Sequence, residues 1–442
     1  MIKVAYDLSF VSQHYRRLNF EKFGIYQVAH QVLEEILAKD DQTIELGVTS
    51  LCSDKIYDAF VGHALLLYDA LKAQKNIKFE SCFQSKIGKI SDYYWLYDRL
   101  YADLFRKRSN LLSHLLRAGR KIILSILELY QKWNLSYDFR IGNYDLFHSV
   151  YLGLPDPEFT GKMKRVLTIH DLIPLVRPDL VSPNLAQEFR QKILNTIVRN
   201  RDFIICVSHH TKQQVCDYLH IDLAQVFVTH LGASSAFYHL DDQDKFFRSF
   251  HLSHLTKKTY FLGTASLESR KNTQFLIRCF CDLIQSYPDL EINLVLVGSL
   301  QPAQEALVHN INQHTLGQTK SQIICAGYAS DADLNLLYNH ARAFIFPSLY
   351  EGFGLPVLEA LQCGTPVICS RTTALPEVAG EAALFIDPQD SDTLKQAMLQ
   401  IITDDQLRSS LSHKAMDRAK QFSWKKCADR TIEAYQSIVE WD

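Results

Sequence analysis

Short runs of hydrophobic residues alternate with amphipathic stretches along most of the 442-residue chain. Short apolar runs separated by helices are typical of parallel strands that are buried on both faces. The pattern therefore predicts an α/β architecture with doubly wound parallel sheets. The clearest expected strands span residues 3–6, 165–169, 203–207, 226–229, 260–263, 292–297, 323–326, 343–346 and 366–369.

Two stretches interrupt this alternation and indicate how the chain is divided. A chain of this length exceeds what one hydrophobic core usually serves, so we expect two domains. The polar stretch 240–258 predicts a linker between a first domain, 1–240, and a second domain, 241–422. Residues 62–140 predict a helical insertion in the first domain, and residues 423–442 predict a final helix that packs back on that domain.

Composition narrows the class of protein. Hydrophobic residues make up 47% and charged residues 22%, as in an ordinary globular protein. The 47 basic and 49 acidic side chains nearly cancel, which argues against nucleic acid as the main partner. The ten cysteines include no Cys-x-x-Cys pair, so they predict neither a disulfide framework nor a structural zinc site. With no signal-peptide core and no long apolar run, we expect a cytoplasmic protein.

The loop after the expected strand 343–346 carries candidate chemistry. Pro356 is expected at the first position of a helix, which Gly364 ends. A helix start at the carboxyl end of a parallel strand directs backbone N–H groups at a phosphate. Glu351 in the loop and Glu359 about one turn into the helix would flank that phosphate, as a nucleotide sugar requires. On spacing alone, a solvated helix carboxylate and turn glycines explain the pattern equally well.

Glu351 opens the sequence Glu-Gly-Phe-Gly-Leu-Pro, Glu359 follows it after seven intervening residues, and Gly-Thr-Pro-Val comes next at 364–367. This pattern resembles the signature of glycosyltransferase family 4, a retaining family with the GT-B fold. The resemblance continues through 374–380 and 422–424 and so covers nearly the whole second domain. It implies two Rossmann-like domains that face a central cleft, with the donor held by the second and the acceptor by the first. The expected donor-binding residues are Gly24, Gly263, Glu351, Gly352, Phe353, Gly354, Leu355 and Glu359.

A basic pair forms a second candidate cluster. A strand, a turn at Gly263 and then Arg270 and Lys271 before a helix suit a diphosphate leaving group, whose negative charge grows during the reaction. In the family, the lysine that matches Lys271 contacts the donor diphosphate. Many members carry arginine directly after the glycine, where this chain has Thr264, so Arg270 is expected to supply the second charge. Taken alone, the pair is more typical of a solvated helix start.

His170 follows the expected strand 165–169, where such sheets present side chains to a ligand. A lone histidine there is more often structural. The His-Asp-Leu pattern is similar to that of mannosyltransferase-like family members, in which this histidine faces the transferred sugar. The neighbouring Asp171 is equally consistent with a structural role. Gly24 would let the backbone approach the diphosphate, and Ser208 is explained as a helix N-cap.

Neither a metal nor another cofactor is expected. The first domain shows no Asp-x-Asp pair in a strand-end loop, and Asp331 with Asp333 reads as the start of a helix. Residues 81–140 hold eleven basic and five acidic side chains, a net charge of +6, interleaved with apolar residues. Such a segment suits peripheral contact with the inner membrane face or a polyprenyl-diphosphate-linked acceptor. An ordinary helical subdomain with a solvated basic face explains it as well.

These observations predict a retaining hexosyltransferase of surface-polysaccharide synthesis. The donor would be a GDP- or UDP-sugar, with mannose as the first choice, and the acceptor a glycan or a lipid-linked glycan. Two alternatives stay open, namely a GT-B sugar-nucleotide epimerase and a non-catalytic glycosyltransferase-like scaffold. The Glu-Gly-Phe-Gly-Leu-Pro signature argues against the first alternative. The joint presence of Glu351, Glu359, Lys271 and His170 argues against the second.

Overall fold

A computed structural model describes most of the chain, and the statements below concern the described residues alone. The predicted insertion lies outside them except for the two-residue strand β3, which is a strand where we expected helix. Most of the predicted linker and Gly24 also lie outside them. The described residues are 1–7, 25–39, 44–49, 78–79, 143–240, 255, 258–300, 305, 308–309, 311–312 and 322–441.

The described strands form two sheets, and the pairings with a defined register are all parallel. The strand order is β3-β2-β1-β4-β5-β6-β7 in the first sheet and β10-β9-β8-β11-β12-β13 in the second. The strands are β1 Ile2–Asp7, β2 Ile44–Thr49, β3 Lys78–Phe79, β4 Leu146–Ser149, β5 Lys164–Ile169, β6 Asp202–Cys206, β7 Val226–Val228, β8 Tyr260–Ala265, β9 Asn293–Gly298, β10 Ile323–Gly327, β11 Ala343–Phe346, β12 Val367–Ser370 and β13 Ala383–Ile386.

All nine strands expected from the sequence are present, with ends that differ by at most two residues. Besides the two-residue β3, three further strands, β2, β4 and β13, escaped prediction. Strand β2 includes a glutamate and a glycine, which are uncommon in strands, and β4 and β13 have four residues each. Runs this short carry too little hydrophobic pattern to be told from loops.

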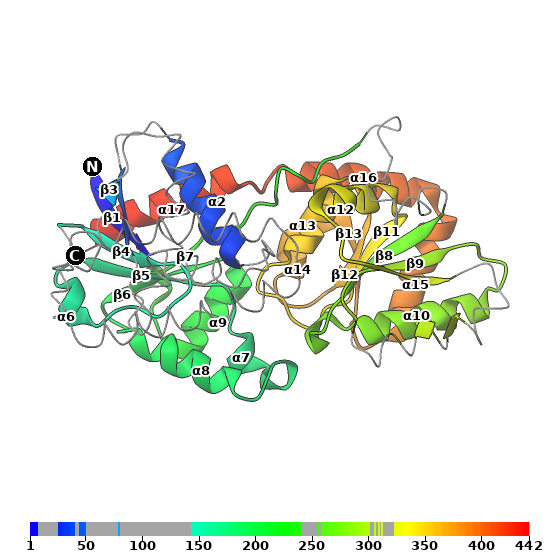
Figure 1. Cartoon of the computed structure of the whole chain (residues 1–442), viewed down its shortest axis with the longest axis horizontal. Coiled ribbons are helices and arrows are strands. Elements are labelled where there is room, and N and C mark those ends of the chain that lie inside the picture. Colours follow the sequence, from blue (N-terminus) through cyan, green and yellow to red (C-terminus); the bar gives the residue numbers. More distant parts are fainter. Residues whose placement is uncertain are drawn as a thin grey trace, which may run out of the picture. The chain divides into compact units, whose positions relative to one another are not determined.

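Helices cover both faces of the second sheet (Figure 1). Helices α10 (Thr273–Ser286) and α15 (Ser391–Thr403) pack together on one face, and α12 (Asp331–His340) and α13 (Leu355–Gln362) lie on the other. The core on the α10 side is built from strand and helix side chains that are almost completely buried, including Phe261, Leu276, Leu294, Ile345 and Leu394. The sheet therefore holds the ends of β8 and β11 in fixed, adjacent positions.

By the density of its internal contacts, the chain divides into two compact units. The first unit consists of Met1–Lys22, Thr43–His148 and Pro155–Met163, and the second of Phe23–Gln42, Ser149–Leu154 and Lys164–Asp442. The second unit therefore contains strands β5 to β13 and all the side chains of the candidate site described below.

The final helix, α17 (Trp424–Val439), belongs to the same unit and begins after the N-cap Ser423. It packs against α2 (Ile25–Leu37), and Asp429 forms an ion pair with Lys39. The remaining helices that matter here are α7 Ile173–Val176, α8 Leu185–Lys192, α9 His209–Leu219, α14 Leu375–Ala379 and α16 Asp405–Ala419. No helix in the described part of the chain is long and apolar enough to cross a bilayer.

Candidate functional site

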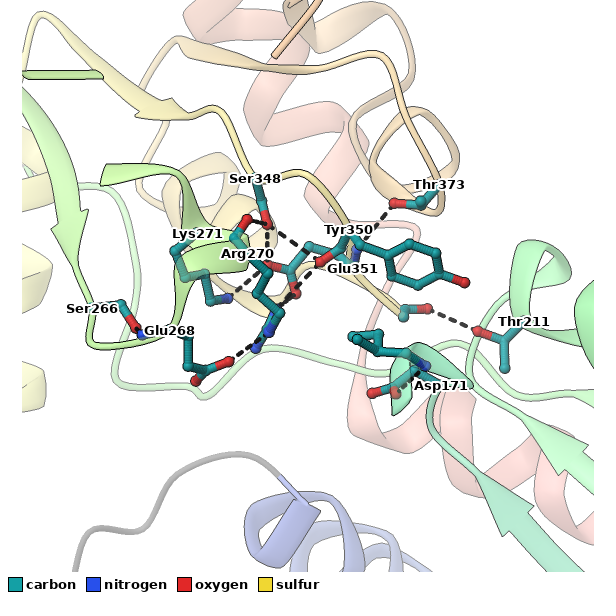
Figure 2. Close-up of polar contacts among 12 residues, drawn as sticks. Asp171, Thr211, Ser266, Glu268, Arg270, Lys271, Ser348, Tyr350, Glu351 and Thr373 are labelled. Carbon is teal, nitrogen blue, oxygen red and sulfur yellow. Dashed lines mark hydrogen bonds and ion pairs between the residues drawn. The ribbon is translucent and has the colours of Figure 1, made fainter. Parts of the chain in front are cut away.

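The carboxylate of Glu351, in the loop after β11, is held between two cations (Figure 2). Lys271 Nζ lies 2.7 Å from Glu351 Oε1, and Arg270 Nη1 lies 2.7 Å from Oε2. The Ser348 hydroxyl donates a hydrogen bond of 2.8 Å to Oε1. Burial by itself would raise the pKa of Glu351, but the two cations outweigh it and the pKa lies below its ordinary value. Glu351 is therefore ionised at neutral pH.

The two cations come from the loop after the neighbouring strand, β8. Arg270 and Lys271 lie in a 3-10 turn, Ser269–Lys271, directly before α10, as the sequence predicted. Arg270 also forms an ion pair of 2.5 Å with Glu268. Its carbonyl accepts a hydrogen bond of 2.7 Å from the Leu349 N–H, and the Ser348 hydroxyl oxygen lies 3.0 Å from the same carbonyl oxygen. These backbone contacts join the loops of the two adjacent strands.

The helix start expected after β11 is present, with a shift of one residue. The helix begins at Leu355 after the N-cap Gly354, which has φ +115°, and Pro356 is the second helical residue. The sequence places Pro356 first, but its ring fits either position of a first turn because neither position needs an N–H partner within the helix. Gly354 provides no side-chain cap, Pro356 has no N–H, and the Val357 N–H donates to the Gly354 carbonyl at 3.0 Å. The Leu355 N–H is therefore the group at this helix start that can bind an anion.

Glu359 lies farther along α13 and faces a buried tyrosine. The Tyr338 hydroxyl donates a hydrogen bond of 3.1 Å to Glu359 Oε2. Burial raises the pKa of Glu359 to about 7, although the bond from Tyr338 opposes this rise. Near neutral pH the side chain therefore exists in both protonation states, and a ligand that donates hydrogen bonds favours the carboxylate.

His170 directly follows β5, as predicted. Its Nε2 atom lies 2.9 Å from the carbonyl oxygen of Val150. Burial lowers the pKa of His170 to about 4, against the opposing effect of this hydrogen bond, so the ring is neutral at pH 7. Because a carbonyl can only accept, the ring hydrogen is on Nε2 and Nδ1 is an acceptor. Asp171 Oδ1 accepts the Ile173 N–H at 2.9 Å at the start of α7, in keeping with the structural alternative.

A cavity of about 200 Å³ adjoins His170. Its polar lining comes from His170, Asp171, Glu268 and Arg270, and helix α8 contributes apolar side chains that include Phe189. The cavity therefore combines hydrogen-bonding groups with an apolar wall, as sugar-binding pockets do.

Gly352 is tightly enclosed. A Cβ atom at this position would lie 2.2 Å from the His170 carbonyl oxygen, so only glycine fits. The Gly352 carbonyl accepts hydrogen bonds from the Ser208 hydroxyl at 2.7 Å and the Thr211 hydroxyl at 3.3 Å. Ser208 also caps α9 by accepting the Thr211 N–H, which confirms its prediction as an N-cap. Its contact with Gly352 was not predicted.

Other residues predicted for the donor site have different surroundings. The predicted turn at Gly263 is wrong, because β8 continues to Ala265 and a Cβ at Gly263 would lie 2.6 Å from a methyl group of Leu276. Phe353 is buried and packs edge-on against the Phe422 ring. Internal packing thus accounts for Gly263 and for Phe353, and the contact of either residue with a donor stays a prediction.

The sequence did not reveal three side chains that hold either the Glu351 loop or the start of α9. Besides Ser348, the Thr373 hydroxyl accepts the Glu351 N–H at 3.1 Å, and Glu377 accepts two N–H groups of α9. Glu377 lies in a stretch already noted for its family resemblance, which was the available signal. Ser348 and Thr373 carry no spacing pattern that could have indicated a role.

Two family models match the chain. Residues 244–418 match the one described as glycosyl transferases group 1, and residues 97–236 match the one described as glycosyltransferase family 4. The chain is 32% identical over 275 residues to the O-antigen chain mannosyltransferase B of Escherichia coli, covering 62% of this chain and 71% of that protein. It is 31% identical over 283 residues to the serotype-specific mannosyltransferase WbdA of Escherichia coli, covering 63% of this chain. This match covers 34% of WbdA, so the chain spans about a third of that relative.

Solved structures share the fold at low sequence identity. A sucrose-phosphate synthase from Thermosynechococcus elongatus aligns with 99% of this chain and 98% of its own, with a TM-score of 0.57 and 18% identity. HepE from Anabaena, solved with UDP and glucose, covers 99% of this chain and 100% of its own, with a TM-score of 0.58 and 15% identity. The likeness confirms the predicted GT-B fold of two Rossmann-like sheets. Together with the mannosyltransferase relative and the two matched models, the loop chemistry described above leads to one conclusion: the chain belongs to glycosyltransferase family 4.

Proposed function

We propose that the protein is a retaining mannosyltransferase that uses a nucleoside-diphosphate mannose, with GDP-mannose as the first choice. Its acceptor would be a glycan or polyprenyl-diphosphate-linked glycan in the synthesis of a surface polysaccharide. The observation that carries this proposal is the position of Glu351 between Lys271 and Arg270 beside the uncapped start of α13. The names of the Escherichia coli relatives support mannose as the transferred sugar and a surface polysaccharide as the product.

Each charged group has a role that follows from its chemistry. The negative charge of a sugar diphosphate can be shared by Lys271, Arg270 and the Leu355 N–H at the start of α13, and that charge increases as the glycosidic bond breaks. Glu351, relieved of part of its pairing, accepts hydrogen bonds from sugar hydroxyls. Glu359 accepts hydrogen bonds from the ribose. The neutral His170 offers Nδ1 to the transferred sugar.

The acceptor is proposed to use the cavity beside His170. In retaining members of the family, as the resemblance implies, the acceptor hydroxyl attacks from the face that the diphosphate leaves. The cavity is lined by both His170 and Arg270, so an acceptor there lies beside groups assigned to the donor sugar and diphosphate. This arrangement requires no nucleophile from the protein. No metal is needed for the leaving group, since the two cations supply the positive charge.

A transfer assay tests the function. Purified protein is incubated with GDP-mannose, UDP-glucose or GDP-glucose, with and without a polyprenyl-diphosphate-linked mannosyl acceptor. Release of GDP and mannosylated product are both measured. We expect product with GDP-mannose alone among the donors, only when acceptor is added, and with the anomeric configuration of the donor retained. Conversion of the donor without acceptor would indicate an epimerase instead, and donor binding without release would indicate a scaffold.

Peripheral membrane contact is proposed from charge alone. Residues 81–140, with a net charge of +6, lie outside the described part of the chain, so the proposal rests on their sequence. We expect the protein to co-sediment with vesicles that contain anionic lipid at low salt and to remain in the supernatant with neutral vesicles. Equal sedimentation with both would contradict an electrostatic contact.

A further inference from the structure

Two histidines and a glutamate from three different segments of the chain lie close together at the start of helix α9. His209 is the first residue of α9, His230 follows β7, and Glu377 lies in α14. One ring nitrogen from each histidine and one carboxylate oxygen of Glu377 all lie within 4.8 Å of one another. The donor chemistry described above uses none of the three side chains.

The carboxylate of Glu377 is fixed in place. His230 Nε2 lies 2.5 Å from Glu377 Oε1, and the N–H groups of His209 and His210 donate to the two carboxylate oxygens at 2.8 and 3.2 Å. These contacts orient the carboxylate, so Glu377 is a preoriented oxygen ligand.

The ring nitrogens of His209 are available to bind a ligand. Within the described part of the chain the His209 ring makes no side-chain hydrogen bond, and it packs edge-on against the His230 ring with centroids 5.4 Å apart. Both rings line a cavity of about 790 Å³, together with side chains that include Lys212 and Phe422. A hydrated ion can therefore reach the ring nitrogens from solvent.

We propose that His209, His230 and Glu377 bind one divalent transition-metal ion, with Zn²⁺ as the first choice and water in the fourth position. Two imidazoles and a carboxylate are an established ligand set for zinc. Tetrahedral zinc with bonds of about 2.0–2.1 Å separates its ligand atoms by roughly 3.3 Å. His230 Nε2 and Glu377 Oε1, now 2.5 Å apart, therefore have to separate by about 0.8 Å, and no other ligand pair has to close by more than about 1.5 Å. The ion takes the place of the hydrogen between His230 and Glu377, and the His230 ring then carries its hydrogen on Nδ1.

The bound ion links α9 directly to α14. The residue before His209 in the chain is Ser208, whose hydroxyl holds the Gly352 carbonyl next to Glu351. The proposed metal thus stiffens the start of α9, which also supports the loop that carries Glu351. It supplies no charge to the reaction, and the proposal does not depend on which sugar is transferred.

The test uses the full chain after removal of metal with a chelator. Binding of Zn²⁺ is measured by calorimetry and that of Co²⁺ by its visible absorption, which is intense for tetrahedral coordination. We expect one ion per chain and at least a tenfold weaker affinity in His209→Ala and in His230→Gln. The matched control is His413→Ala, since His413 is exposed on α16 and bonds only a carbonyl of its own helix.

The exposed position of His209 keeps this test independent of folding, because its ring can be removed without disturbing a packed core. Thermal unfolding without metal should be unchanged in His209→Ala, and added Zn²⁺ should raise the melting temperature of the parent and of His413→Ala only. Zinc binding of equal strength in all the variants would place the ion elsewhere and overturn the proposal. No measurable binding to the parent would overturn it as well.

Discussion

Lys271 and Arg270 share one carboxylate, and this pairing sets what each side chain can contribute. In the described structure Glu351 balances part of their charge, and a donor diphosphate would take over that role. Lys271→Ala should therefore lower turnover about a hundredfold or more, as removal of one charge-stabilising donor does in other enzymes. The initial rate of GDP release with acceptor present measures this effect.

The control for Lys271 is Lys420→Ala, whose side chain is exposed and pairs only with Asp417. It should leave turnover unchanged, because exposed ion pairs contribute little. Turnover of Lys271→Ala equal to that of this control would remove Lys271 from the leaving-group role.

Glu359 should make donor affinity depend on pH. Its pKa of about 7 in the unliganded protein falls when ribose hydroxyls donate to the carboxylate, so affinity rises with pH below about 7 and levels off above it. Between pH 8 and pH 6 we expect about a tenfold loss of affinity, as the ionised fraction falls by that factor. Calorimetry with GDP-mannose measures this, since its diphosphate does not titrate near neutral pH.

Glu359→Gln is the matched variant, because the amide keeps the shape of the side chain and cannot ionise. Its affinity should be low and the same at both pH values. A pH dependence that persists in Glu359→Gln would assign the titration to another group and move the ribose contact away from Glu359.

At the residue scale, the sequence indicated the candidate groups but not their pairing. The positions of His170, Arg270 and Glu351 after strands follow from hydrophobic pattern, and the family resemblance added their roles. The contact of Lys271 with Glu351 spans 80 residues, and no local pattern encodes such a distance. The raised pKa of Glu359 results from burial of its carboxyl group, which the hydrogen bond from Tyr338 only partly offsets, and it could not be predicted either.

Individual elements were predicted well where hydrophobic runs are long and poorly where a glycine has two explanations. The sequence predicts a turn at Gly263, whereas in the structure the absence of a side chain there makes room for Leu276 beside a continuing strand. Gly354 does end a loop, with φ +115°. The sequence cannot distinguish these cases, because glycine serves both close packing and positive φ.

Gly352 gives the sharpest prediction at the element scale. In Gly352→Ala the new Cβ would lie 2.2 Å from the backbone oxygen of His170, which cannot rotate away. The loop must shift, and the shift separates Glu351 from the cations of the β8 loop. We expect turnover to fall by about a hundredfold, in line with the cost of displacing catalytic groups by about 1 Å. The transfer assay with GDP-mannose measures it.

Gly327→Ala is the control for this prediction. Gly327 also has a positive φ, +65°, but a Cβ there meets nothing within 4 Å. It should cost about 1–2 kcal/mol of stability from backbone strain and leave turnover unchanged. Full activity in Gly352→Ala would show that the loop can adapt without consequence for the site.

At the scale of the whole molecule, the alternation of strands and helices was sufficient to predict two parallel sheets, because βαβ connections leave few other arrangements. The sheet order brings β8 and β11 together although 80 residues lie between their carboxyl ends, Ala265 and Phe346, so that the two loops of the site are neighbours. The predicted order of domains along the chain stays a prediction, since the described residues omit most of the proposed linker.

The charge balance of the whole donor site leads to the last prediction, which concerns metal. The site provides Lys271, Arg270 and the positive end of the α13 dipole at Leu355 as partners for the diphosphate. Turnover should therefore be the same before and after exhaustive treatment with EDTA, and added Mg²⁺ or Mn²⁺ should change it less than about twofold, well below the effect of losing a charge-stabilising donor. Turnover lost with EDTA and restored by Mg²⁺ in both the parent and His209→Ala would reveal a metal in the reaction itself. Loss confined to the parent and restored by Zn²⁺ would instead trace the requirement to the histidine site, because His209→Ala no longer provides that site.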